Sequence, residues 1–266
     1  MTPTKLFIEF DGQQLEVVTD IPASRDFFER TYRPMLVSAL TASAGRLEAL
    51  KKGEGYVIRG FDTLEIEEER SADSFNDYLR RQVLFLFIKA RPDLLWIHAA
   101  AVERNGSALL LVGPSGQGKS TLSTRLCEKG WRLLSDDAAP IRMGSNEVLP
   151  FLQSPHRRKP SEREMQANEL GLDDKEEVVI PHSSLRRDPA TVKAIVFPVF
   201  KHGASADLTL SPPGEAALDV LRNNTNFVDH KEDAVARVAS LSRAVQMYRL
   251  SYGDWQSAAR LLEGLA

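Results

Sequence analysis

Hydrophobic and polar residues alternate along the first 19 residues in two runs. Every second residue is apolar over residues 6–10, and the alternation resumes over residues 15–17 after the dipeptide Asp11-Gly12. A period of two interrupted by Asp-Gly is typical of a β-hairpin. The chain is therefore expected to begin with two antiparallel strands.

The pattern over residues 20–70 predicts more short elements. Ser24 can cap a short helix that carries Phe27 and Phe28 and that Pro34 would interrupt. Residues 35–52 predict a second helix, and the apolar positions over residues 56–66 predict two strands on either side of Gly60. Residues 1–70 should thus form a small α/β unit without a catalytic signature. It either covers the main sheet, which is the favoured interpretation, or binds a partner.

Longer apolar runs begin after residue 70, where residues 71–266 are expected to form the main domain. Residues 72–89 predict a largely buried helix that Pro92 stops. Pro198 suggests an edge strand or a strand end. Strands are expected at residues 94–102, 108–112, 131–135, 178–180, 192–200, 208–210 and 247–252, with a strand pair within 138–153. Helices are expected at residues 121–129, 213–222 and 231–246, and after the cap Asp254.

One loop in this region carries a recognisable chemistry. The octapeptide Gly113-Pro114-Ser115-Gly116-Gln117-Gly118-Lys119-Ser120 follows an apolar strand and precedes a helix. It fits G-x-x-x-x-G-K-[ST], the Walker A or P-loop motif, in which glycines turn backbone N–H groups toward phosphates. Residues 113–121, including Thr121, are therefore predicted to bind ATP. Lys119 would reach the β- and γ-phosphates, and Ser120 would bind Mg²⁺.

Other candidate site residues lie close to this loop in the sequence. Asp136-Asp137 ends the next strand, where one carboxylate can hold a metal while the other takes a proton from an attacking hydroxyl. His98 lies on the preceding strand and is either a core residue or a site residue. The basic run Arg157-Arg158-Lys159 is either a solvated loop or a contact for phosphate or an acidic substrate.

Composition narrows the class of protein. The chain has 266 residues and a net charge of −3, so neither a nucleic-acid nor a membrane partner is expected. Its single cysteine, Cys127, excludes an internal disulfide and is expected to pack in a helix. Charged residues interrupt the apolar N-terminal stretch, which excludes a typical signal peptide, so a cytoplasmic protein is expected.

Three segments within residues 98–137 resemble a known superfamily. They are His98-Ala-Ala-Ala-Val, the P-loop, and Gly130-Trp-Arg-Leu-Leu-Ser-Asp136-Asp137. Together they resemble the HPr kinase/phosphorylase superfamily. The likeness is greatest to HPr-kinase-related proteins, some of which phosphorylate the C-terminal serine of lasso precursor peptides.

This resemblance implies an α/β P-loop kinase domain of the HPr kinase/phosphoenolpyruvate carboxykinase type, with a mixed sheet, beside the small N-terminal unit. It assigns Lys119 to phosphate, Ser120 to Mg²⁺ and His98 to the active-site strand. The acidic pair supplies a base and a metal contact; Asp136 is assigned as the base and Asp137 as the metal ligand, although the sequence does not distinguish them.

There are also departures from the superfamily. Thr121 stands where HPr kinases have glutamate, and their arginine- and glycine-rich signature is missing. Neither phosphorolysis nor HPr as substrate is therefore expected. The hypothesis is an ATP- and Mg²⁺-dependent kinase acting on a serine of a peptide or protein. The alternatives are a kinase of free serine or a similar metabolite and a non-catalytic nucleotide-binding module. Whether the chain forms a homo-oligomer stays open.

Overall fold

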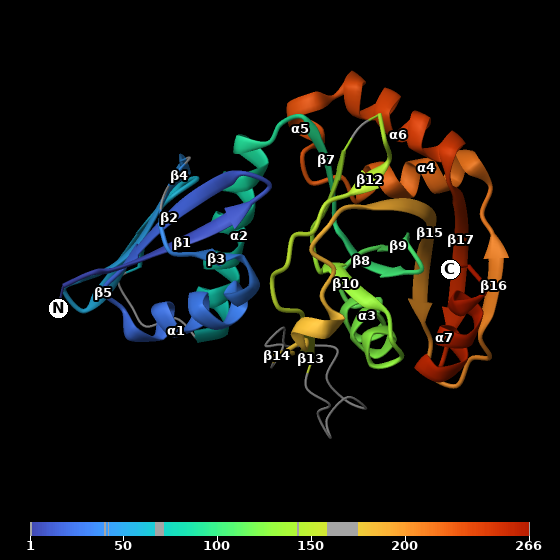
Figure 1. Cartoon of the computed structure of the whole chain (residues 1–266), viewed down its shortest axis with the longest axis horizontal. Coiled ribbons are helices and arrows are strands. Elements are labelled where there is room, and N and C mark those ends of the chain that lie inside the picture. The colour runs from blue at the N-terminus through green and yellow to red at the C-terminus, as the bar shows by residue number, and fades with distance from the viewer. Residues whose placement is uncertain are drawn as a thin grey trace.

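The computed structural model describes residues 2–39, 41, 43–66, 72–142, 144–158 and 175–265. Figure 1 shows two parts, each built on its own sheet, with the N-terminal part on the left and the larger part on the right. The chain is thus a mixed α/β protein. No helix within these ranges is both long and apolar enough to cross a membrane.

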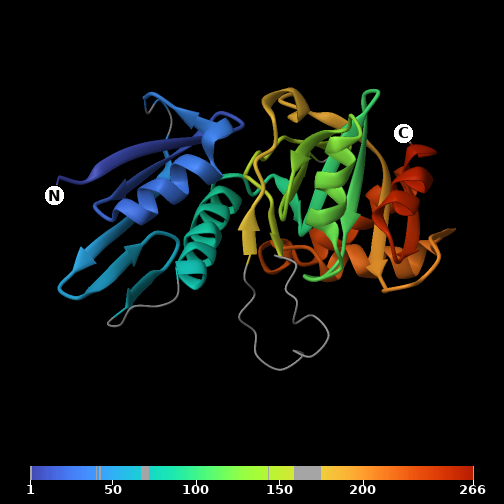
Figure 2. The same ribbon diagram turned by 90° about the horizontal axis from the view of Figure 1, so that it is seen from below.

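The N-terminal part is a six-stranded sheet in the order β3-β1-β2-β4-β5-β6. The strands are β1 (Thr4–Phe10), β2 (Gln13–Thr19), β3 (Leu36–Val37), β4 (Ser43–Lys52), β5 (Gly55–Arg59) and β6 (Thr63–Ile66). Strands β1 and β2 form the predicted hairpin, and β5 and β6 pair around Gly60 as predicted. Helix α1 (Pro22–Thr31) follows the hairpin, and helix α2 (Ala72–Ala90) packs against β2 and β4 (Figure 2).

The helix predicted over residues 35–52 is wrong. Residues 43–52 form β4, which pairs in parallel with β2 and antiparallel with β5. Leu47 and Ala49 alternate inward and are fully buried. The two ladders and this burial outweigh the helix propensity of the segment. Ser24 is not a cap either, because α1 begins at Pro22 with Ile21 at its N-cap position.

The larger part is built on a mixed nine-stranded sheet. Its main path runs β10-β8-β9-β15-β12-β11-β7, and β17 joins β15 to β16. The strands are β7 (Leu94–Ile97), β8 (Ala99–Arg104), β9 (Ser107–Val112), β10 (Arg132–Ser135), β11 (Ala139–Arg142), β12 (Glu147–Val148), β15 (Ala190–Phe200), β16 (Asp207–Leu210) and β17 (Gln246–Tyr252). The central β15 is parallel to β9 and β17 and antiparallel to β12.

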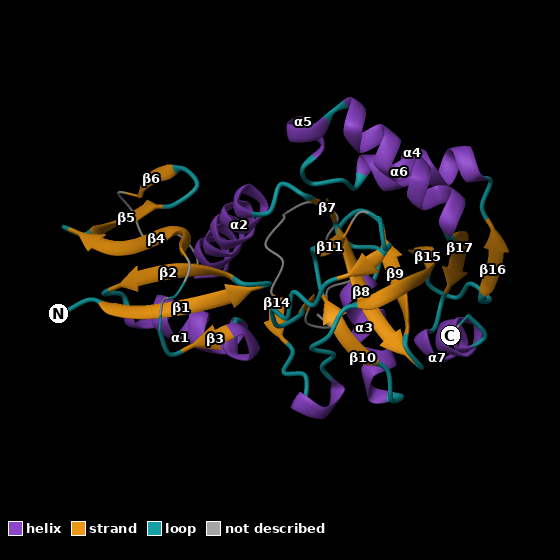
Figure 3. Cartoon of the chain, turned by 45° about the horizontal axis from the view of Figure 1, so that its top comes forward, coloured by secondary structure: helices purple, strands orange, loops and turns teal. Residues whose placement is uncertain are grey.

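Helices cover both faces of this sheet (Figure 3). Helices α3 (Lys119–Glu128) and α7 (Trp255–Glu263) contact each other on one face; α4 (Pro213–Arg222) and α6 (Glu232–Ala244) pack together on the other, beside the short α5 (Phe227–His230). Leu109 and Leu111 belong to the first core, whereas Leu110 and Val112 belong to the second. A strand buried on both faces must be apolar throughout, which explains the run that precedes the P-loop.

Several boundaries differ from the sequence expectations. The strand predicted over residues 94–102 is divided at His98 into β7 and β8. No strand covers residues 178–180; β14 (Lys175–Glu177) precedes them and pairs with β13 (His156–Arg158). Pro198 lies inside β15, but pairing with β9 ends at Val196, so Pro198 has only β17 as a neighbour. A missing N–H is tolerated there because that side of β15 is locally an edge.

Candidate active site

The P-loop links the end of β9 to the start of α3. Gly116 and Gly118 have φ angles of 88° and 82°, a region that favours glycine. A Cβ at Gly118 would also clash with Tyr252 Oη on β17, so no larger residue fits without movement. The loop is therefore shaped by its own glycines and by a strand far away in the sequence.

Lys119 lies at the first position of α3 and folds back over the loop. Its Nζ donates to Gly113 O at 2.6 Å and to Pro114 O at 3.0 Å, and lies 3.0 Å from His98 Nε2. Its burial lowers the pKa of the ammonium, an effect that the charges of Asp137 and Asp136 oppose. The cation is thus held among carbonyl oxygens at the place where a P-loop binds phosphate.

Asp136 is buried beside the start of α3, with only 3% of the residue exposed. Ser120 Oγ donates to its carboxylate at 2.9 Å, and Ser123 Oγ lies 3.4 Å from it. Burial, reinforced by the charge of Asp137, raises the pKa of Asp136 to about 6. Among the described residues Asp136 forms no ion pair, so the charges of Arg80 and Lys119 only partly compensate its burial.

Asp137 has a different environment although it is the next residue. Its φ angle is 70°, and its side chain is 53% exposed. Its Oδ1 lies 3.1 Å from His98 Nδ1, which also contacts the Asp137 carbonyl oxygen at 2.9 Å. Partial burial would raise the pKa of Asp137, but the hydrogen bond with His98 and the charges of Arg80 and Lys119 lower it. The break between β7 and β8 places His98 for this contact.

These groups line one cavity of about 710 Å³. The sequence-predicted residues that it brings together are His98, Lys119, Asp136, Asp137 and the loop residues Ser115, Gly116, Gly118, Ser120 and Thr121. Gly113, Pro114 and Gln117 are in the same loop but do not line the cavity. Cys127 is buried in α3, as expected, and burial raises its thiol pKa to about 12.

Sequence reasoning missed several residues of this cavity. Arg80 of α2 is nearly buried and reaches it from the N-terminal side, and Phe200, Tyr252 and Trp255 line it on the C-terminal side. None of them belongs to a local motif. The sequence does contain one indication of Arg80, because a charged residue in a largely apolar helix must be either exposed or placed in a polar pocket.

The predicted contacts of the basic run stay predictions. Arg157 and Arg158 belong to the backbone of β13, but their side chains lie outside the described residues, as does all of Lys159. The neighbouring His156 does line the cavity. The run therefore starts at the edge of the site.

Comparisons with known proteins support the same region. Residues 65–153 match the family model described as "SynChlorMet cassette protein ScmC". The HPr kinase/phosphorylase of Caldanaerobacter subterraneus subsp. tengcongensis is 32% identical over 103 residues, which cover 39% of this chain and 30% of the relative. The enzyme of the same name from Exiguobacterium sp. is also 32% identical, covering 35% of this chain and 33% of the relative. The chain thus matches about a third of the length of these relatives.

A solved structure has a weaker likeness. The Hpr(Ser) kinase/phosphatase from Coxiella burnetii aligns at 12% identity and a TM-score of 0.33, covering 64% of this chain and 92% of that one. The family-model match spans the segment that holds the P-loop and the acidic pair. The sequence similarities confirm the resemblance predicted from the sequence: part of this chain is similar to HPr kinase/phosphorylases and to the ScmC family model.

Proposed function

We propose that this protein is an ATP- and Mg²⁺-dependent kinase that transfers the γ-phosphate to a hydroxyl, namely that of a serine in a peptide or protein. The observation that carries the proposal is a pair of adjacent aspartates beside the P-loop that differ in burial and in hydrogen-bond partner. Asp136 is buried and accepts a hydrogen bond from Ser120, whereas Asp137 is half-exposed and contacts His98 in the same cavity. Binding of a nucleotide alone does not require the second carboxylate.

The P-loop would hold the triphosphate. Gly116 and Gly118 permit its backbone N–H groups to converge, and α3 begins directly behind them at Lys119. The Lys119 ammonium would exchange the Gly113 and Pro114 carbonyls for phosphate oxygens. The buried Lys119 cation would then face the full negative charge of the phosphates in place of the carbonyl dipoles of Gly113 and Pro114.

The residues beside α3 fit a magnesium ion. Ser120 and Asp136 offer a hydroxyl and a carboxylate 2.9 Å apart, and hard oxygen donors are the ligands that Mg²⁺ prefers. A nearby cation would also compensate the buried charge that raises the pKa of Asp136. When bound, Mg²⁺ would neutralise the charge that develops on the phosphates.

Asp137 would then serve as the base. It is accessible to an acceptor, and its lowered pKa keeps it ionised at neutral pH. The acceptor oxygen would form a bond to the γ-phosphorus, the bond from that phosphorus to the bridging oxygen of ADP would break, and the hydroxyl proton would pass to the Asp137 carboxylate. This assignment reverses the roles expected from the sequence, because the contact with Ser120 favours Asp136 as the metal ligand.

The acceptor class distinguishes this proposal from its rivals. Purified protein would be incubated with γ-labelled ATP and Mg²⁺ together with a degenerate serine peptide library, free serine, or no acceptor. The proposal expects label on peptides, dependent on Mg²⁺. Label on free serine alone would favour a metabolite kinase. Retained ATP binding without any labelled product would indicate a non-catalytic nucleotide-binding module.

A further inference from the structure

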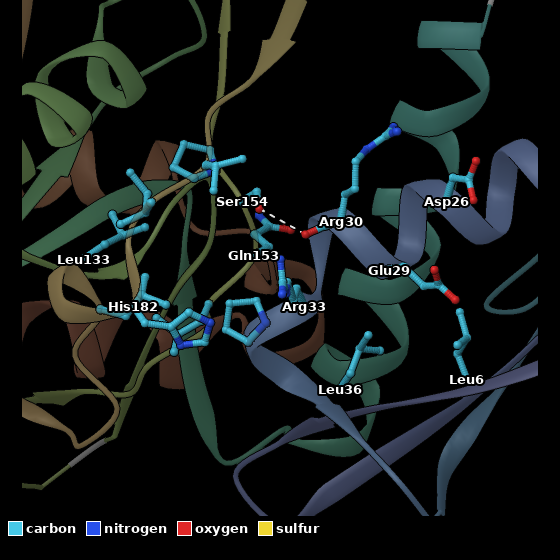
Figure 4. Close-up of a pocket in the computed structure, with 16 residues that line it drawn as sticks. Leu6, Asp26, Glu29, Arg30, Arg33, Leu36, Leu133, Gln153, Ser154 and His182 are labelled. Carbon is cyan, nitrogen blue, oxygen red and sulfur yellow. Dashed lines mark hydrogen bonds between the residues drawn. The ribbon is translucent and has the colours of Figure 1, made fainter.

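A second cavity separates the N-terminal part from the larger part. It encloses about 580 Å³ between α1 and β3 on one side and β10 with residues 152–155 and 179–185 on the other (Figure 4). Its floor contains Leu133, Leu152 and Leu185, which are at most 8% exposed. At the rim, Val179 is 81% exposed, an unusual state for a large apolar side chain beside a cavity.

Charges of both signs border this interdomain cleft. Asp26 and Glu29 lie on α1, well separated from His182 in Figure 4. Arg187 bridges the two sides: it donates to Pro34 O, next to Arg33 on the N-terminal side, and lies 3.3 Å from His182 Nδ1 on the other side. Within the described ranges, the Arg33 side chain has no hydrogen bond or ion pair, whereas Glu29 is already paired with Arg25.

The cleft and the candidate active site share a wall. Gln153 and Ser154 line the cleft, and the Gln153 amide donates to Asp136 O at 2.7 Å. Ser154 N donates to Thr31 O at 2.8 Å, and Ser154 O accepts from Arg80, which lines the nucleotide cavity. His156 also lines that cavity, only three residues beyond Gln153, so the two cavities are separated by about 10 Å of chain at most.

We propose that the interdomain cleft binds an extended segment of the acceptor polypeptide, a few residues away from the serine that is phosphorylated. An apolar side chain of that segment would fill the leucine floor beneath Val179, and an acidic side chain would pair with Arg33. This inference rests on the proposed kinase function and adds the sequence preference of its acceptor.

The lining matches a polypeptide better than a small anion. Phosphate or nucleotide sites gather like-charged donors, whereas this cleft combines an apolar floor with opposite charges at its borders. Strand β3 is the edge of the N-terminal sheet, and its Leu36 lines the cleft. An extended peptide can add to such an edge through its backbone while its side chains enter adjoining pockets.

The test compares exposed residues inside and outside the cleft. A positional library of serine peptides would be phosphorylated by wild type, by Val179→Glu and by a matched control, Val228→Glu, whose valine is 78% exposed and outside the cleft. Val179→Glu should lower kcat/KM for the preferred peptides by about tenfold or more, as expected when one apolar contact is lost. ATP binding should stay unchanged, and Val228→Glu should match wild type.

A charge reversal supplies the second arm. Arg33→Glu should shift the library preference from acidic to basic residues at one position, a change that general destabilisation would not produce. Arg222→Glu, an exposed reversal on α4, should keep the wild-type preference. If Val179→Glu equals Val228→Glu and Arg33→Glu keeps the preference for acidic residues, the cleft proposal is overturned while the kinase proposal stands. If wild type labels no peptide, the peptide-kinase proposal fails and the cleft proposal fails with it.

Discussion

At the scale of single residues, two adjacent aspartates have opposite electrostatic environments. Asp136 is enclosed by the start of α3, which raises its pKa to about 6, whereas His98 and nearby cations lower the pKa of Asp137. Carboxylates whose pKa values diverge are suited to different roles at one site. The two side chains have different partners at this strand end: the Asp136 carboxylate accepts from Ser120, whereas the Asp137 carboxylate contacts His98.

The raised pKa of Asp136 predicts a pH-dependent cost to folding. The folded state binds this proton more tightly than the unfolded state, so stability falls as pH rises from about 4 to about 6. Above that window, the ionised group costs on the order of 3 kcal/mol. Asp136→Asn removes the charge, so without metal or nucleotide its melting temperature should exceed that of wild type at pH 8 and approach it at pH 4. Equal differences at both pH values would contradict this.

At the scale of elements, the P-loop depends on β17. Tyr252 lies directly against Gly118, and its hydroxyl donates to Gln117 O at 3.4 Å. Phe200 of β15 packs edge-on against the Tyr252 ring at 5.5 Å. The loop conformation is therefore set by two strands that follow it by at least 70 residues in the chain, as well as by its own glycines.

This packing predicts different outcomes at two glycines. Gly130→Ala, at a φ of 86° with no atom within 4 Å of the added Cβ, should cost about 1–2 kcal/mol for backbone strain alone. Gly118→Ala should lower the free energy of unfolding by about 1–3 kcal/mol more than Gly130→Ala, because its Cβ overpacks the loop, and it should also weaken ATP binding. Adding Tyr252→Phe to Gly118→Ala should restore part of the loss. Denaturant unfolding and ATP titration measure both; equal losses at the two glycines would refute the steric account.

Regular periods were the most predictive feature of the sequence at this scale. The β1–β2 hairpin follows from its alternation and its turn dipeptide, and α7 is capped by Asp254, as predicted, through Ser257 N at 2.8 Å. The expected helix over residues 35–52 failed because its segment Leu-Glu-Ala-Leu-Lys has good helix formers. Only the neighbouring β2 and β5 decide that it is a strand, and local sequence does not contain them.

At the scale of the whole molecule, the two sheets are joined by a common core. Phe10 of β1 contacts Phe87 of α2, Trp96 of β7 and Phe151 at ring-centroid distances of 5.3–5.7 Å. Arg80 adds polar links, because it donates to Ser154 O and lies within 3.5 Å of Thr31 Oγ1. The N-terminal part thus contributes one wall of the candidate active site.

Arg80 both links the two parts of the molecule and lines the candidate active-site cavity, so its substitution should have two effects. Arg80→Met should lower the free energy of unfolding by about 1–3 kcal/mol, because Ser154 O loses its donor. It should also weaken the proposed ATP binding, because a positive charge leaves the candidate active-site cavity. Arg81→Met, at the exposed neighbouring position, is the control and should change neither property. Similar behaviour of the two variants in denaturation and titration would contradict this role.

Contacts between segments that are distant in the sequence limit how much of the site could be predicted from the sequence. Lys119, Ser120 and Asp136 come from consecutive elements, so their convergence follows from a strand, a helix and the next strand. Arg80 and Gln153 come from outside this unit, and packing between distant segments brings them to the acidic pair. The roles of the two aspartates depended on which one meets Ser120, a distance that sequence order does not give.

Asp137 provides the most direct test of the central claim. Single-turnover transfer from γ-labelled ATP to a serine peptide would be measured for wild type, Asp137→Asn, and Asp254→Asn, a control that removes another carboxylate from the same cavity. Asp137→Asn should slow transfer by about 10²–10⁴-fold, the usual contribution of a general base, with ATP affinity nearly unchanged. Asp254→Asn should transfer normally. Transfer by Asp137→Asn at the wild-type rate would contradict the account.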